Sequence, residues 1–109
     1  MLVKIDRYRV RPDQIEQHQT LQARARALYR KYFQDPVLFL RSQDDPCQWV
    51  SIHWYPDEET YHRRMTLINA EPESVSLWEA FRAILDPRTP FIQEEYYDQI
   101  DARNLVMNP

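Results

Sequence analysis

Residues 37–59 read VLFLRSQDDPCQWVSIHWYPDEE. Val37–Arg41 is a short apolar run, long enough for a β-strand and too short for a helix. The polar residues that follow have the composition of a turn, and Cys47–Tyr55 then alternates as a strand does. Two strands joined by a short turn predict a hairpin. Asp57, followed by two glutamates, predicts the N-cap of a helix whose acidic first turn suits the helix dipole.

Similar patterns on either side of this hairpin predict the other elements. Leu2–Val10 and Phe91–Ile100 predict the first and the last strand. Apolar residues at steps of three and four predict a helix from residue 13 to about residue 33. The helix after Asp57 is interrupted at Pro72, and a further helical piece is expected over Ser74–Leu85. The order of elements predicts a ferredoxin-like α+β domain, βαββαβ, with a four-stranded antiparallel sheet.

Length and charge exclude several classes of protein. The chain has 109 residues, which suits one domain, expected over residues 1–100 with a polar tail at 101–109. The net charge is −3, and the charges are interspersed, so we expect neither nucleic acid nor membrane as a partner. No window approaches the roughly 18 consecutive apolar residues of a membrane span. The first residues lack the long apolar stretch of a secretory signal, so we expect a cytoplasmic protein.

The residues that bind common cofactors are also missing. Cys47 is the single cysteine, so it forms neither an internal disulfide nor a cysteine-based zinc site. The chain has no glycine, and phosphate loops and dinucleotide fingerprints need glycine where the backbone approaches phosphate. Its three histidines are scattered without metal-ligand spacing. We therefore expect no metal, haem or nucleotide cofactor.

The strands carry large apolar side chains on both faces. Trp49 alternates with Val50, and Tyr96 with Tyr97, so one residue of each pair faces away from the helices. An apolar sheet face of several hundred Å² is rarely left in contact with water. We therefore expect a homodimer in which a second copy covers this face and the two sheets close into a barrel.

Three segments resemble one superfamily, the dimeric α/β barrels. They are the first strand with its Pro-Asp helix start, WVSIHWYPDEETY at residues 49–61, and the helical pieces YHRR at 61–64 and LWEAF at 77–81. The resemblance covers residues 2 to about 100 and is to the antibiotic-biosynthesis-monooxygenase and NIPSNAP groups. It implies an activity among cofactor-independent oxygenases of aromatic polyketides, haem-degrading enzymes and isomerases, or no catalytic activity.

The haem-degrading branch fits this sequence poorly. That branch is implied to use an Asn on the first strand, where this chain has Asp6. It also uses a Trp and a His ligand on the second helix. Arg63 or Arg64 stands near the Trp position, and His62 comes too early for the ligand. We therefore do not expect haem degradation.

Polar side chains interrupt the first strand and supply the candidate site. Asp6 and Tyr8 share a face with Lys4, and the resemblance places that face at a cleft between sheet and helices. There Asp6 is a candidate base, and an ion pair with Lys4 or a helix arginine is the structural alternative. His53 is a candidate proton shuttle, with a hydrogen-bonded interior or interface histidine as the alternative. His18 is expected to pack on the apolar stripe of the first helix.

Five further residues are candidate substrate contacts, namely Tyr8, Trp54, Tyr61, Arg64 and Tyr96. For Trp54, packing in the core is the alternative. The first functional hypothesis is a cofactor-independent, monooxygenase-like enzyme acting on an aromatic or apolar small molecule, with Asp6 or His53 as its base. The second is a non-catalytic dimeric small-molecule-binding or stress-related protein of the same fold. An open pocket with a titratable group would favour the enzyme.

Overall fold

Four strands form one antiparallel sheet in the computed structural model, which describes residues 1–100. The predicted polar tail at 101–109 lies outside the described residues. The sheet has the order β2-β3-β1-β4, and its strands are β1 (Leu2–Arg9), β2 (Val37–Arg41), β3 (Gln48–Tyr55) and β4 (Gln93–Asp98). The predicted hairpin is β2-β3, whose strands pair antiparallel.

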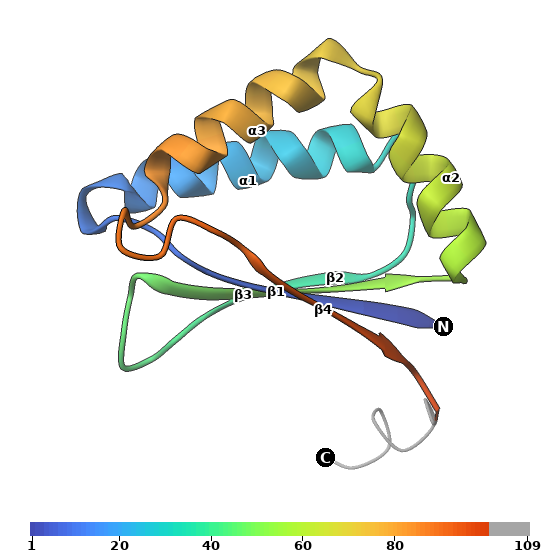
Figure 1. The fold of residues 1–109 in the computed structure, drawn as a ribbon, viewed down its shortest axis with the longest axis horizontal. Helices are drawn as coiled ribbons and strands as arrows, with labels where there is room; N and C mark the ends of the chain where they lie inside the picture. The colour runs from blue at the N-terminus through green and yellow to red at the C-terminus, as the bar shows by residue number, and fades with distance from the viewer. Residues whose placement is uncertain (101–109) are drawn as a thin grey trace.

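The helices all lie on one side of this sheet (Figure 1). They are the short 3₁₀ helix η1 (Pro12–Gln14), α1 (Ile15–Tyr29), α2 (Glu58–Asn69) and α3 (Pro72–Ile84). This two-layer arrangement with its crossed strand order is the ferredoxin-like α+β fold that the sequence predicted.

Several predicted boundaries were wrong. The first helix ends at Tyr29 and not near residue 33, because the chain turns there and returns towards β2. This turn buries Phe33 against the core. Pro72 starts α3, two residues earlier than predicted, because proline suits the first position of a helix. The last strand is confined to β4, shorter than the predicted Phe91–Ile100.

The core fills the space between the sheet and the helices. Its members come from both layers and from the segments that join them, for example Val10, Leu21, Leu28, Tyr55, Ile68 and Ile84. Among the described residues, no helix is long and apolar enough to cross a membrane.

The strand register places the polar residues of β1 at the centre of the sheet. Lys4 lies opposite His53 on one side and Tyr96 on the other, and Asp6 lies between Ser51 and Glu94. Residues directly opposite each other in an antiparallel pair share a face. These six side chains therefore project together towards the helices.

The other face of the sheet carries exposed apolar side chains. Leu38 and Leu40 on the edge strand β2 are 48% and 46% exposed. Their positions alternate with Val37 and Phe39, which line the helix side. Val50 and Ile52 continue this outer face onto β3, where they are partly exposed.

Candidate active site

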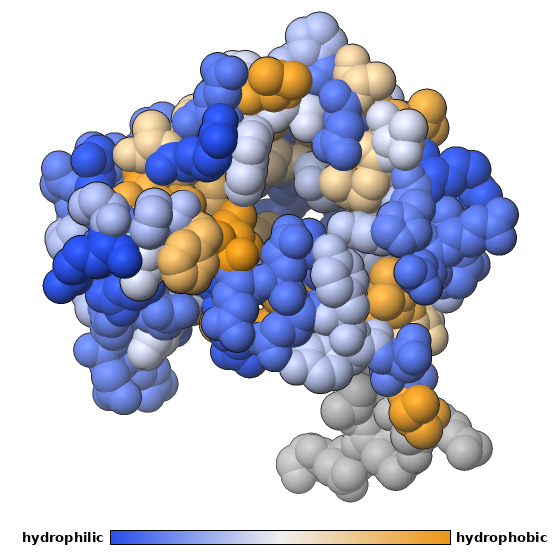
Figure 2. Space-filling view, in the orientation of Figure 1, coloured by the Kyte–Doolittle hydropathy of each residue, from blue (hydrophilic) through white to orange (hydrophobic). Residues whose placement is uncertain are grey.

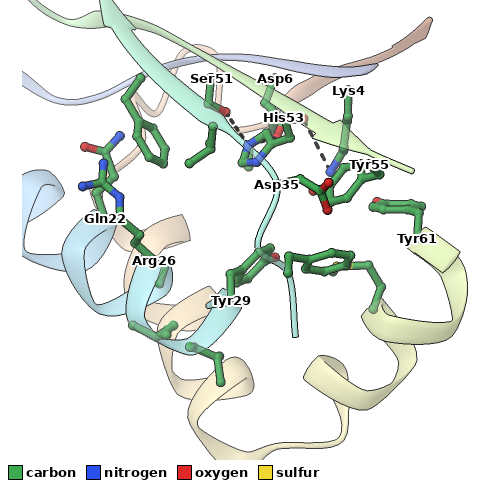
Figure 3. Close-up of a pocket in the computed structure, with 18 of the residues that line it drawn as sticks. Lys4, Asp6, Gln22, Arg26, Tyr29, Asp35, Ser51, His53, Tyr55 and Tyr61 are labelled. Carbon is green, nitrogen blue, oxygen red and sulfur yellow. Dashed lines mark hydrogen bonds and ion pairs between the residues drawn. The ribbon is translucent and has the colours of Figure 1, made fainter. Parts of the chain in front are cut away.

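A cavity of about 480 Å³ lies between the sheet and the helices. Side chains of all four strands form one wall, and side chains of the three α-helices and of the segment between α1 and β2 form the rest. Figure 2 shows the surface hollowed between the two layers, with hydrophilic and hydrophobic residues around the opening. Figure 3 shows side chains from the sheet and from α1 and α2 converging on this space. This volume and mixed lining are typical of small-molecule sites.

Lys4 and Asp6 form a buried ionic pair in the cavity wall. Lys4 Nζ lies 3.6 Å from Asp6 Oδ1 and 3.3 Å from Glu94 Oε1. The two paired β1 side chains are only 13% and 14% exposed. Lys4 Nζ also lies 5.9 Å from the ring centres of both Tyr61 and Tyr96, which suits attraction between a cation and an aromatic face.

Opposing effects set the protonation of this pair. Burial raises the pKa of Asp6; the ammonium group of Lys4 opposes this, and Glu94 adds to it. Burial favours the neutral amine of Lys4, but Asp6, Tyr61 and Glu94 together outweigh burial and raise the Lys4 pKa. Lys4 therefore stays charged. Asp6 Oδ1 has no hydrogen-bond partner among the described residues, so it can accept a proton from a bound molecule.

His53 lies beside Asp6 in the same wall. Its Nε2 is 3.7 Å from Asp6 Oδ2 and 3.1 Å from the Ser51 hydroxyl oxygen. Its ring is parallel to the Tyr55 ring, with centroids 6.2 Å apart. Burial, and then the charge of Lys4, lower the His53 pKa to about 4. The imidazole is therefore neutral near pH 7 and is a weaker base than an ordinary histidine.

Four of the five predicted substrate contacts line the cavity, and one does not. Tyr8, Tyr61 and Tyr96 line the cavity. Trp54 also borders it, although on β3 it alternates with His53 and Tyr55 and so occupies a position of the outer face opposite Val3.

Arg64 is not among the residues that line the cavity. Its guanidinium lies over the Phe33 ring, 5.6 Å from the ring centre. The structure therefore does not bring Arg64 together with the other predicted contacts.

Sequence reasoning missed Gln22, Arg26, Asp35 and Glu94, all of which line the cavity. Gln22 and Arg26 each come one residue after a member of the apolar stripe of the first helix, Leu21 and Ala25. A stripe widened by one position would have included both. Asp35 gave no comparable signal, because Asp-Pro is typical of a turn.

Within residues 1–100, no three His, Cys, Asp or Glu side chains are placed to hold a metal ion together.

Solved structures of other proteins share this architecture. The chain has the fold of the antibiotic biosynthesis monooxygenases and the NIPSNAP proteins. SnoaB, a cofactor-independent oxygenase from Streptomyces nogalater, is 18% identical, with a TM-score of 0.70 over 94% of this chain and 95% of that one. An uncharacterized NIPSNAP domain protein from Burkholderia xenovorans is 13% identical, with a TM-score of 0.75 over 92% and 95%.

A third structure, an antibiotic biosynthesis monooxygenase, is 21% identical, with a TM-score of 0.65 over 93% of this chain and all of that one. The sequence matches no protein-family model and no curated protein. The resemblance noted in the sequence is thus confirmed for the fold.

Proposed function

We propose that this chain is a cofactor-independent, monooxygenase-like enzyme acting on an aromatic or apolar small molecule. The observation that carries the proposal is the carboxylate of Asp6, buried in the wall of an aromatic-lined cavity. Its Oδ1 lies 3.6 Å from Lys4 Nζ and makes no hydrogen bond among the described residues, so a bound molecule can donate one to it. Its neighbour within the same wall is a neutral histidine. The solved structures of this fold that are named as oxygenases support the reaction class by analogy.

Asp6 is the proposed base. A carboxylate with a raised pKa removes a proton more readily than an ordinary one, because its basicity lies nearer the working pH. The substrate is then an aromatic molecule with an acidic C–H or O–H group. Lys4 would stabilise the anion that forms, because its charge persists inside the cavity.

The reaction balances without a cofactor. Loss of a proton from an activated CH₂ gives a carbanion, which supplies electrons to dioxygen and forms a C–O bond. Protonation gives a hydroperoxide at that carbon. A base then removes the second hydrogen as a proton while the O–O bond breaks, leaving a carbonyl group and water. One oxygen atom enters the product and the other enters water. His53 is the proposed shuttle for one of these protons.

The active form is proposed to be a homodimer that closes through the outer sheet face. Leu38, Leu40, Val50 and Ile52 support this, because they form an apolar surface on the side without helices. We also infer a cytoplasmic location. A single cysteine and no cysteine pair are typical of proteins that work in reducing compartments.

Oxygen consumption tests the proposed reaction. A panel of aromatic phenols that carry an activated CH₂ group is screened with an oxygen electrode, and active compounds are tested again with Asp6→Asn and His53→Gln. We expect Asp6→Asn to lower turnover by about a hundredfold or more, since a positioned base contributes on that order. We expect His53→Gln to lower it less. His62→Gln, at an exposed histidine on α2, is the matched control and should not change the rate.

Thermal unfolding of the same variants distinguishes the second hypothesis, a non-catalytic binding or stress-related protein. The 3.6 Å pair between Lys4 and Asp6 is the observation that favours it. If that pair is structural, Asp6→Asn costs about 3–5 kcal/mol and lowers the melting temperature by roughly 10 °C or more. A large loss of stability with no effect on ligand binding would contradict the enzyme assignment. A melting temperature within a few degrees of the wild type would support it.

A further inference from the structure

A second polar pair lies at the other end of the β1 segment of the cavity. The Tyr8 hydroxyl is 2.7 Å from His18 Nε2. Tyr8 lines the cavity, whereas His18 on α1 has 0% of its surface exposed. The imidazole is held between the rings of Trp49 and Phe81, at centroid distances of 4.4 and 6.0 Å. The histidine therefore has one fixed orientation and one hydrogen-bond partner among the described residues.

The second ring nitrogen of His18 indicates which atom carries the proton. Nδ1 is buried and has no hydrogen-bond partner in residues 1–100. A buried N–H without an acceptor is rare and costly, whereas a buried lone pair without a donor is better tolerated. Burial also lowers the His18 pKa to about 4, so the ring carries a single proton near pH 7. That proton is accordingly on Nε2, and His18 donates to the Tyr8 oxygen.

The hydroxyl hydrogen of Tyr8 is then left to donate elsewhere. Gln22 follows His18 by one helical turn, and the two side chains therefore share a face of α1. Gln22 lines the cavity with Tyr8, and its buried Nε2 has no hydrogen-bond partner in the described part of the chain. This end of the cavity thus offers two neighbouring hydrogen-bond donors, the Tyr8 hydroxyl and the Gln22 amide. Burial raises the Tyr8 pKa and the nearby Gln22 amide opposes that rise, but the distances show no hydrogen bond from either group to an acceptor within residues 1–100.

We infer that Tyr8 and Gln22 bind a carbonyl or phenolate oxygen of the cavity ligand, with His18 as the positioning residue that turns the Tyr8 hydroxyl towards it. One such oxygen has two lone pairs and satisfies both donors. Tyr8 is two residues from Asp6 on β1, about 7 Å along the strand. The ligand therefore has one acidic group at Asp6 and a separate oxygen at Tyr8. This inference rests on the proposed function, because it deepens the description of the same substrate.

The position of the His18 proton is tested first, without any ligand. Nitrogen NMR of the protein with isotopically labelled histidine distinguishes the two neutral tautomers. The variants His53→Gln and His62→Gln assign the three histidine signals. We expect His18 to carry its proton on Nε2 at about pH 7. A proton on Nδ1 would overturn the inference, because Tyr8 would then donate to His18 and have no hydrogen for a ligand.

Two probes of similar shape test the ligand. Lawsone is a hydroxynaphthoquinone with an acidic hydroxyl group and carbonyl oxygens, and β-naphthol has the hydroxyl group alone. Titration calorimetry should show that Tyr8→Phe and Gln22→Leu each lower the affinity for lawsone by about tenfold, the size of one hydrogen bond. Their affinity for β-naphthol should not change. Tyr32→Phe, at a tyrosine outside the cavity lining, is the control and should leave both affinities unchanged.

The role of His18 is tested by coupling it to Tyr8. His18→Phe keeps an aromatic ring among Trp49 and Phe81 and removes the hydrogen bond. We expect it to lower lawsone affinity, and to add little further loss in the double variant with Tyr8→Phe, because both changes remove one interaction. If His18→Phe does not fold, the tautomer measurement still decides.

The remaining outcomes separate this inference from the proposed function. Equal lawsone affinity in the wild type and Tyr8→Phe, with β-naphthol still bound, would overturn the inference alone and leave the two donors to water. Failure of both probes to bind the wild-type protein would count against the inference and the proposed substrate class together.

Discussion

Burial is the largest of the effects that shift the pKa of His53 and of His18. Neither ring has a paired carboxylate close enough to offset the loss of water, since the nearest, Asp6, lies 3.7 Å from His53 and is itself engaged by Lys4. Both pKa values are accordingly lowered to about 4, from an ordinary value of about 6.5. These histidines therefore make the folded state sensitive to acid.

The sign of this effect gives a prediction for pH. Between about pH 6.5 and about pH 4 the unfolded chain binds a proton at each histidine and the folded chain does not, so the free energy of unfolding falls on acidification. His53→Gln removes one of the two side chains that bind a proton only in the unfolded chain. We expect the variant to lose less stability than the wild type between about pH 7.5 and about pH 4.5, by on the order of 2 kcal/mol.

Urea unfolding at the two pH values provides the measurement. His62→Gln is the control, since the His62 side chain is 65% exposed, and it should follow the wild type. Comparison between variants matters here, because protonation of Asp6, whose pKa is raised, favours the folded state and acts in the opposite direction. An equal loss of stability in His53→Gln and the wild type would contradict the prediction.

Among the elements, α2 shows how a local sequence signal places a cavity residue. Asp57 was predicted as its N-cap, and this is confirmed: Asp57 Oδ1 accepts a hydrogen bond of 2.7 Å from the Thr60 backbone N–H. The cap fixes the first turn, and that turn carries Tyr61 into the cavity. Asp57→Ala should therefore lower the free energy of unfolding by about 1 kcal/mol.

Denaturant unfolding measures the effect of the cap. Asp57→Asn keeps an oxygen that accepts the same bond and should lose only a few tenths of a kcal/mol. A similar loss in both variants would assign the effect to the charge at the helix dipole and not to the cap.

The helices and strands also show which features of the fold and the site could be predicted from the sequence alone. Strong periodic patterns predicted the order of the strands and helices, because period two and period 3.6 are local properties of the chain. The same periodicity placed Lys4, Asp6 and Tyr8 on one face, and the lining of the cavity confirms that face. Arg64 was different, since a long side chain on α2 has several directions open to it, and contact with Phe33 selected one.

The Tyr8 and His18 pair also lay beyond local patterns. His18 was expected to pack on the stripe of the first helix, and it does. Nothing in residue spacing could have revealed its hydrogen bond to Tyr8, because the angle at which α1 crosses the sheet depends on packing of the whole core. Polar contacts between layers are therefore the part of the site that needed the structure.

For the whole molecule, the two faces of the sheet differ in what covers them. The helix side is covered by α1, α2 and α3 (Figure 1). The cavity lies between these helices and the sheet. The outer face has no layer over it within residues 1–100, yet Leu38 and Leu40 stand on it nearly half exposed. The sheet of a second copy has the same apolar outer surface. In a two-fold symmetric dimer the outer faces of the two sheets would cover each other.

Sedimentation equilibrium should therefore give a dimer at micromolar concentration. Leu38→Glu places a charge on the outer face, where burial against a partner would cost far more than exposure to water, so this variant should be monomeric or dissociate at much higher concentration. Leu67→Glu is the matched control: Leu67 is 51% exposed, close to the 48% of Leu38, but it lies on α2. It should remain a dimer. If both variants dissociate, the interface includes the helices. If the wild type is a monomer, the outer face is not an interface between copies, and the cavity must work within one chain.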